Sequence, residues 1–138
     1  SSYSGQTGYI VYAYKVGSSY RQDIQFDEMS IDINGSTTDL APDSGLWARN
    51  TSYTTSLSYP SSNWNNTIST STSASNRWNL DSGGTPSGST GTTKDASGST
   101  TGKYLYFEGS SPNYSASNRY YWFRSKNTFT LSSGGGGA

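Results

Sequence analysis

An aromatic run that follows a long polar stretch places the strongest constraint on the fold of this chain. Residues 103–108 read KYLYFE and contain neither glycine nor proline. An alternating run rich in aromatic residues predicts a half-buried strand. Proline apart, the preceding residues 83–102 carry no apolar side chain larger than alanine. A structureless loop of that length is uncommon in a compact domain and is usually functional, disordered or fixed by a ligand.

Other segments carry the same kind of pattern. Residues 9–16 read YIVYAYKV and are largely apolar on both faces, which predicts a central strand. Residues 118–125 predict a strongly aromatic strand and residues 129–131 a short one, whereas 46–47 and 53–59 are weaker candidates. No window shows an apolar period of 3.6 residues with caps, so we expect no helix.

Residues 23–33 predict a strand with an irregularity in its middle. Ile24 and Phe26 share one face, but the next apolar set begins at Met29, three residues further on. Keeping both sets in the core requires one extra residue, because successive side chains of a strand alternate between its faces. We therefore predict a β-bulge at residues 27–28.

Composition excludes several classes of function. The chain has no cysteine and no histidine, which removes disulfides, thiolate zinc sites and the commonest general base. The formal net charge is zero, so there is no electrostatic footprint for nucleic acid. No apolar run reaches the length of a membrane span, and we expect no membrane insertion. With 138 residues, 12 tyrosines and 4 tryptophans, we expect one domain with a small aromatic core.

The segment from residue 78 to residue 108 resembles the opening half of MAM domains, which are jelly-roll modules of cell-surface and secreted proteins. The positions that match the family pattern are Trp78, Thr85, Pro86, Ser87, Thr90, Gly91, Asp95, Gly102, Tyr104, Tyr106 and Glu108. Thr92 stands where the family has a proline, and the family's cysteines are all missing. The resemblance therefore implies a fold but carries over no disulfide.

The closing half of the same family resembles an earlier part of this chain. Residues 9–33 are similar to the closing strands and residues 64–131 to the opening ones, so the two halves stand in permuted order. The resemblance implies an all-β, antiparallel jelly-roll sandwich, MAM-like or lectin-like. We expect residues 1–131 to form this single domain and residues 132–138 to be a Gly-rich tail or linker.

The permuted order allows three explanations. The chain could be a circular permutant, a slice of a tandem array, or two halves that complete the sheets of neighbouring copies. Residues 9–16 and 120–124 are apolar or aromatic on both faces, so each strand must be covered. A closed permutant predicts that they pair within the chain. We expect a self-contained fold that nevertheless depends on oligomerisation.

Three acidic residues are candidate metal ligands. Asp27 and Glu28 lie at the predicted bulge, and Asp95 lies in the polar loop. Carboxylates together with loop carbonyls suit calcium, and related jelly rolls carry structural calcium. The alternative is that Asp27 and Asp95 cap turns by accepting backbone N–H bonds. We expect that the chain requires no cofactor, and structural calcium is the one candidate. We also expect Asp27 and Asp95 to approach each other.

Aromatic residues among polar neighbours are candidates for glycan binding. These residues are Trp47, Trp64, Tyr114, Tyr120 and Trp122. Together with Asn, Ser and Arg they form the mixture that stacks sugar rings and binds hydroxyl groups. The alternative is that they fill the core or a subunit interface, where Tyr and Trp are also enriched.

Catalysis has little support in the sequence. Glu108 with Asp81 or Glu28 could form a carboxylate pair, but nine acidic residues always permit some pair. A serine nucleophile would lack its histidine. We therefore expect no enzyme.

The composition, rich in Ser, Thr, Asn, Gly and Tyr without Cys, resembles phage tail fibres, head fibres and capsid decoration proteins. This resemblance implies a structural or adhesive module on a virion surface or in another extracellular assembly. Its partners would be other copies or subunits, with a cell-surface glycan as a further candidate. The alternative is a carbohydrate-binding module of an extracellular polysaccharide-degrading system.

Overall fold

A computed structural model describes residues 5–16, 24–68, 78–82, 94–107 and 119–131. Its elements, in chain order, are β1 Thr7–Gly8, β2 Val11–Val16, β3 Ile24–Phe26, β4 Ser30–Ile33, β5 Ser36–Asp39, the 3-10 helix η1 Pro42–Ser44, β6 Trp47–Thr54, β7 Trp64–Asn65, β8 Trp78–Asp81, β9 Tyr104–Phe107, β10 Arg119–Ser125 and β11 Phe129–Thr130. Every strand pair is antiparallel, and the described residues contain no α-helix. The all-β prediction is confirmed.

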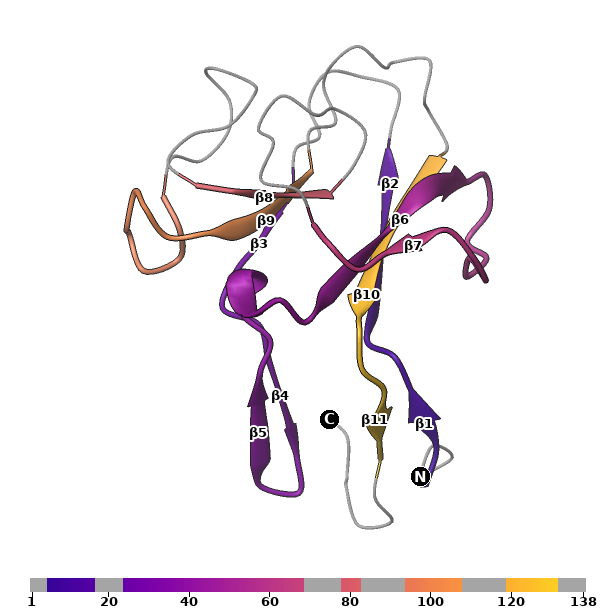
Figure 1. Cartoon of the computed structure of the whole chain (residues 1–138), viewed down its shortest axis with the longest axis horizontal. Helices are drawn as coiled ribbons and strands as arrows, with labels where there is room; N and C mark the ends of the chain where they lie inside the picture. Colours follow the sequence, from indigo (N-terminus) through magenta and orange to yellow (C-terminus); the bar gives the residue numbers. More distant parts are fainter. Residues whose placement is uncertain (1–4, 17–23, 69–77, 83–93, 108–118, 132–138) are drawn as a thin grey trace.

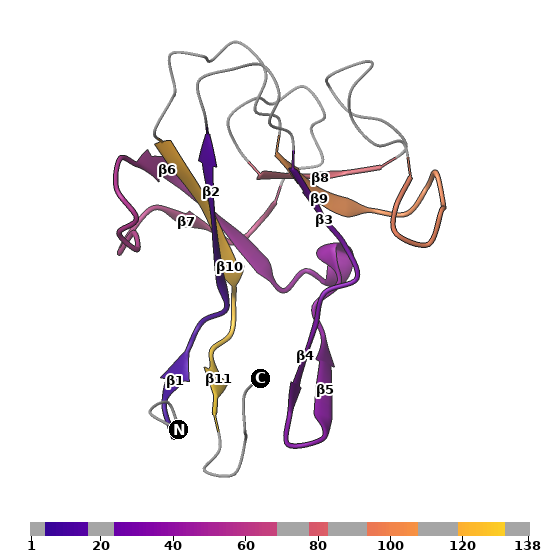
Figure 2. The same cartoon turned by 180° about the vertical axis from the view of Figure 1, so that it is seen from behind.

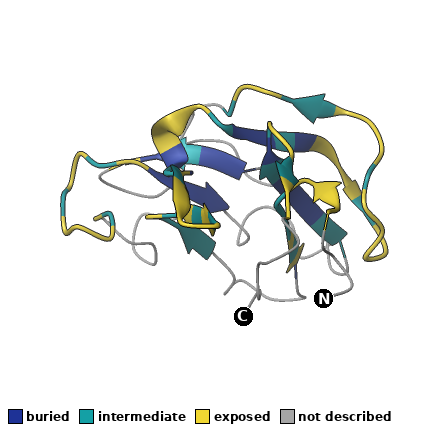
Figure 3. Ribbon diagram, turned by 90° about the horizontal axis from the view of Figure 1, so that it is seen from below, coloured by how far each residue is buried: buried dark blue, intermediate teal, exposed yellow. Residues whose placement is uncertain are grey.

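Two sheets pack against each other and enclose the core (Figure 1). One has the strand order β2-β10-β6-β7 and the other the order β3-β9-β8. Two smaller pairs, β4 with β5 and β1 with β11, extend from one end of this body (Figure 2). Buried residues gather in the strands of the two sheets, whereas exposed residues dominate the connections (Figure 3). The arrangement is consistent with a β-sandwich.

The core between the sheets consists mainly of aromatic rings. Phe123 of β10 lies near its centre, with its ring centroid 4.5 Å from that of Trp78 and 5.1 Å from that of Trp47. Tyr12 stacks on Phe123 at 4.8 Å, and Phe26 meets it edge-on at 5.4 Å. These four partners come from β2, β3, β6 and β8, so one ring contacts both sheets. Aromatic side chains bury large areas, which compensates for the shortage of aliphatic residues.

Strands from the two ends of the chain pair with each other. β2 lies antiparallel to β10, from Val11 opposite Arg124 to Val16 opposite Arg119. This is the pairing within the chain that a closed permutant predicts. The prediction that β2 is central was wrong, because in the described residues it pairs with β10 alone. Its outward residues 11, 13 and 15 are smaller or charged, which suits an edge.

The predicted bulge at residues 27–28 is instead a change of partner. β3 pairs with β9, whereas β4 pairs with β5. Between them Glu28 adopts a φ of 49°, in the left-handed region. The three-residue step in the apolar pattern is thus real, but it marks the point where the chain leaves one sheet for a separate hairpin.

That hairpin has a two-residue turn with a clear local cause. Asn34 and Gly35 have φ values of 56° and 76°, and Ile33 lies opposite Ser36. Asn-Gly is the preferred pair for turns that need positive φ at both positions. The carboxylate of Asp32 accepts hydrogen bonds from the Gly35 N–H at 3.0 Å and from the Thr37 hydroxyl at 2.9 Å.

The remaining strand predictions were mostly confirmed. β10 and β11 match the aromatic run and the short strand that follows it. β9 forms as predicted, but all four of its residues are buried rather than half of them. One strand, β6, takes the place of the two weak candidates at 46–47 and 53–59. Its register against β10 shifts between Tyr121 and Phe123. Residues 83–93 of the polar loop and the tail at 132–138 lie outside the described residues.

Candidate binding face on the four-stranded sheet

Strand β10 divides its side chains between the core and an outer surface. Tyr121 and Phe123 belong to the core cluster, so the residues between them point outward by the alternation of a strand. The outward residues are Tyr120, Trp122 and Arg124. We call the surface that they form with Tyr9, Lys15, Tyr59 and Trp64 the outer aromatic face.

Arg124 is the centre of this face. Its guanidinium lies 3.9 Å from the ring centroid of Tyr9 and 4.4 Å from that of Trp64. Its Nη1 donates a hydrogen bond of 2.6 Å to the Tyr59 hydroxyl. Tyr59 in turn stacks on Trp64, with centroids 5.7 Å apart and planes at 28°. One planar cation therefore fixes three rings, one from the segment before β2 and two from residues 59–64.

A second group of side chains extends the face along β10. The Trp122 indole donates from Nε1 to the Thr54 hydroxyl at 2.9 Å, and only 6% of the residue is exposed. Tyr120 lies beside it with centroids 6.5 Å apart, and the Lys15 ammonium lies 5.7 Å from the Tyr120 ring. Because hydrogen bonds and stacking hold these groups in place, the face is organised before any ligand arrives.

The charges of the four-stranded sheet have one sign. Its strands carry Lys15, Arg49, Arg119 and Arg124, and they contain no aspartate or glutamate. Aromatic rings with cations suit stacking and hydrogen bonding, and they attract negatively charged groups. The face itself offers no carboxylate for general acid or base chemistry.

The structure separates the five aromatic candidates for glycan binding. Trp64, Tyr120 and Trp122 lie together on the outer aromatic face. Trp47 was predicted wrongly, because it is 2% exposed in the core and donates from Nε1 to the Leu40 carbonyl at 2.6 Å. Tyr114 lies outside the described residues.

Sequence reasoning missed four members of the face, namely Tyr9, Lys15, Tyr59 and Arg124. The phase of β10 could have revealed Arg124, because it stands two residues after Trp122. Tyr9 and Tyr59 reach the face from connections, and no local pattern places them there.

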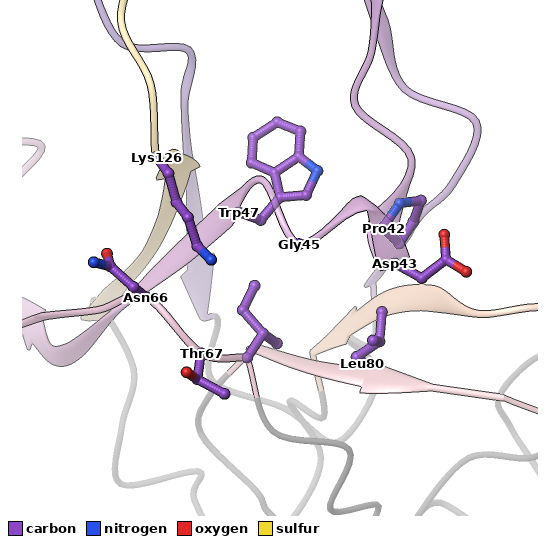
Figure 4. A pocket seen from close by; sticks show the side chains of 9 residues that line it. Pro42, Asp43, Gly45, Trp47, Asn66, Thr67, Leu80 and Lys126 are labelled. Carbon is purple, nitrogen blue, oxygen red and sulfur yellow. The ribbon is translucent and has the colours of Figure 1, made fainter.

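Trp47 borders a small hollow at the edge of the core (Figure 4). The hollow has a volume of about 190 Å³ and is lined on its apolar side by Trp47, Ile68 and Leu80. Lys126 and Asp43 lie on opposite sides of it (Figure 4). It is smaller than the clefts of roughly 300–1,000 Å³ that typically hold small molecules.

The predicted metal ligands Asp27 and Asp95 lie on neighbouring segments, as expected. Asp27 accepts hydrogen bonds from the N–H of Glu28 at 2.8 Å and of Ala96 at 2.6 Å, and so it ties β3 to the Asp95 turn. Asp95 Oδ1 accepts from the Ser99 N–H at 2.7 Å and from the Ser97 hydroxyl at 2.6 Å. The Ser97 hydroxyl bond, assisted by these backbone bonds, holds the pKa of Asp95 below its ordinary value of 3.8. Both carboxylates thus act as turn caps.

Glu28, the third candidate ligand, is exposed at its left-handed position. Within the described residues no three acidic side chains gather into a group that could hold a metal ion. Structural calcium therefore stays a prediction. Thermal melting in millimolar calcium tests it, since an ion that binds only the folded state raises the melting temperature.

Asp81 is a buried carboxylate at the end of β8. It is 2% exposed, its Oδ1 accepts from the Ser82 N–H at 2.8 Å, and its Oδ2 has no hydrogen-bond partner among the described residues. Burial raises the pKa of Asp81 above its ordinary value of 3.8, and the Ser82 bond opposes this only in part.

The Asp81 carboxyl should make stability depend on pH. Because its folded-state pKa is raised, the folded protein binds this proton more tightly than the unfolded chain does. The unfolding free energy should therefore fall as the pH rises from about 3.8 through the folded-state pKa, and this contribution should be constant above it. Urea unfolding at a series of pH values should show that Asp81→Asn removes this component. An Asp43→Asn control should keep this pH-dependent component, because Asp43 is exposed. Equal slopes of unfolding free energy against pH for Asp81→Asn and the parent chain would contradict the assignment.

A substitution at the centre of the outer aromatic face should lower stability measurably. Arg124→Lys keeps the charge but loses the planar stacking on two rings, and we expect a cost of about 1–2 kcal/mol in chemical denaturation. Arg119→Lys is the matched control, since Arg119 lies over one ring only, that of Tyr53 at 4.0 Å. A cost for Arg124→Lys no larger than that for the control would contradict the central role of Arg124.

No family model matches this chain, and neither a curated protein nor a solved structure matches it significantly. The MAM-like assignment and the phage-type origin therefore stay predictions. In the part of the chain that the structure describes, no helix is long and apolar enough to cross a membrane.

Proposed function

We propose that this protein is a non-catalytic structural and adhesive module of a virion surface or another extracellular assembly. Its two packed sheets would belong to a jelly-roll sandwich of the MAM-like or lectin-like kind. The outer aromatic face would be its contact surface, through which it attaches to a protein subunit or to a host surface.

One observation carries this proposal, namely the organised aromatic surface outside the core. Tyr9 and Tyr59 are 41% and 46% exposed, yet both are held by Arg124. Tyr, Trp and Arg are the residues most enriched at the energetic centres of protein interfaces. An exposed group of large rings rimmed by polar residues is expected at an interaction site.

The alternative is a carbohydrate-binding module, and the stacked pair of Tyr59 and Trp64 favours it. Tyr59 stacks on Trp64 and accepts a hydrogen bond from Arg124, so its ring is held in place while 46% of the residue stays exposed and can stack on a sugar. This alternative and the first proposal use the same face and differ in the ligand.

A binding experiment tests the contact surface and separates the two ligands. The folded chain is applied to a glycan array and, in parallel, to candidate protein subunits, with a Tyr9→Ser/Tyr59→Ser variant beside it. We expect this variant to lose binding. Tyr53→Ser should keep it, since Tyr53 is equally exposed at 43% but packs against the inward Tyr121.

Specific glycan binding that disappears in the double variant would establish the carbohydrate-binding alternative. Binding to subunits alone would favour the structural module. Binding that survives the double variant unchanged would remove the outer aromatic face from the proposal.

A further inference from the structure

The charges of this chain are divided between two parts of the molecule. The four strands of the larger sheet carry cations and no acids. Residues 24–46 show the opposite pattern, with no lysine or arginine. Their acidic residues are Asp27, Glu28, Asp32, Asp39 and Asp43. A formal net charge of zero therefore conceals an acidic segment and a sheet whose strands carry only cations, two of which, Lys15 and Arg124, lie on the outer aromatic face.

The acidic part is an exposed projection, which we call the acidic arm and define as residues 27–43. Glu28, Asp32, Asp39 and Asp43 are all exposed. The β4–β5 hairpin of the arm extends beyond the body of the domain, across the molecule from β7 (Figures 1 and 2). Ile31 of the hairpin and Tyr9 of the outer aromatic face line one hollow, so the arm leaves the body next to one end of the face.

We propose that the outer aromatic face of one copy docks on the acidic arm of a second copy of this chain. This inference rests on the proposed function, because it names the partner of the same face. Complementary potentials steer two proteins together and fix which surfaces meet. The cations Lys15 and Arg124 lie among rings that can pack against the hairpin, while the carboxylates of the arm meet the positive charges.

The hairpin itself gives a second reason for a partner. In the described residues β4 and β5 pair only with each other; Ile31 on one face packs against the core cluster, whereas the opposite face, with Ser30, Asp32, Thr37 and Asp39, is exposed. Docking would cover one of its faces. A second copy of this chain carries both surfaces, so its acidic arm matches the cations of the face and its face matches the acids of the arm.

The geometry of such a contact is head to tail. Each copy would present its face to one neighbour and its arm to another, so the interface is heterologous. Heterologous interfaces generate rings when the rotation closes and open filaments when it does not. A twofold dimer forms instead only where both copies make the face-to-arm contact reciprocally.

Two complementary variants test the proposal in the full chain. A face variant carries Lys15→Glu, which reverses an exposed charge beside Tyr120. An arm variant carries Glu28→Lys and Asp43→Lys, two exposed acids that face solvent. Sedimentation velocity follows each protein alone and the equimolar mixture, and near-ultraviolet circular dichroism checks the aromatic core.

The parent chain should assemble with increasing concentration, and the assembly should weaken in about 1 M salt, where the screening length is roughly 3 Å. Each variant alone should bind itself at least about tenfold more weakly, because like charges then oppose each other. In the mixture the intact face of the arm variant meets the intact arm of the face variant. The reversed face and the reversed arm also carry opposite charges, so we expect the mixture to assemble again.

Several results would overturn the proposal. A parent chain that stays monomeric at high micromolar concentration and low salt would do so, as would variants that assemble like the parent. A mixture that forms no complex, although both variants are folded, would also exclude a heterologous contact. If a variant loses its aromatic circular dichroism signal, Lys15→Gln and Asp43→Asn replace it and should show the same pattern in weaker form.

Failure of self-docking and failure of the proposed function give different results. A monomeric parent chain that still binds a glycan or another subunit through the outer aromatic face keeps the proposed function and removes only self-docking. Self-association that is insensitive to Tyr9→Ser/Tyr59→Ser and to Lys15→Glu would remove self-docking through this face, and glycan or subunit binding that is equally insensitive would remove the proposed function as well.

Discussion

Trp78→Ala is expected to destabilise the protein by about 3–5 kcal/mol, the usual cost of removing a large aromatic side chain from a core. Trp78 is buried and its ring centroid lies 4.5 Å from that of Phe123, 5.5 Å from Phe107 and 5.6 Å from Phe26. Its Nε1 also donates to the Tyr121 carbonyl at 3.3 Å, across the space between the two sheets. The substitution therefore leaves a cavity and an acceptor without its donor. A domain at the lower end of the typical range of roughly 5–15 kcal/mol would keep little of its stability.

Chemical denaturation monitored by near-ultraviolet circular dichroism measures this effect. Trp64→Ala is the matched control, because it removes the same side chain from the half-buried outer aromatic face. We expect the control to cost about 1 kcal/mol, as most substitutions away from a core do. Similar losses for Trp78→Ala and Trp64→Ala would show that the packing between the sheets does not dominate stability.

Gly102→Ala should have the second largest effect. A Cβ atom at this position would overlap with the carboxylate of Asp95. The carboxylate would have to rotate away and give up its bonds to the Ser99 N–H and the Ser97 hydroxyl. The loss of these charge-assisted hydrogen bonds should lower the unfolding free energy, by less than Trp78→Ala does, in thermal or urea unfolding.

A double-mutant cycle separates this clash from a general intolerance of alanine at residue 102. Once Asp95→Ala has removed the carboxylate, Gly102→Ala has little left to displace. The double variant should therefore be clearly less destabilised than the sum of the two single variants. Additive losses would mean that Gly102 is needed for a reason other than contact with Asp95.

The strands were predictable where a local alternation of side chains decides the structure. β9 and β10 follow directly from runs of aromatic residues, and the beginning of β3 follows from Ile24 and Phe26. The partner of each strand is decided elsewhere. The three-residue step to Met29 looked like a bulge, although Asn34-Gly35 already marks a hairpin turn that allows the chain to leave the sheet.

The candidate site was only half predictable for a similar reason. Trp64 and Trp122 could be selected by residue type, but the same criterion selected Trp47, which fills the core. Arg124 became recognisable only when the phase of β10 was known. The approach of Tyr9 and Tyr59 depends on contacts between distant parts of the chain, for which the sequence contains no local pattern.

The pairing of the first and last described strands determines how this domain responds to tension. Thr7 lies opposite Thr130, and further inward Val11 lies opposite Arg124 and Val16 opposite Arg119. A load applied at both ends acts on the outermost pair first and reaches the next pair only after that one has parted. The ladder therefore opens one pair at a time, as a zipper does. A load that enters through the β4–β5 hairpin bypasses this ladder and is carried by the aromatic core, so the point of attachment decides whether the module extends or resists.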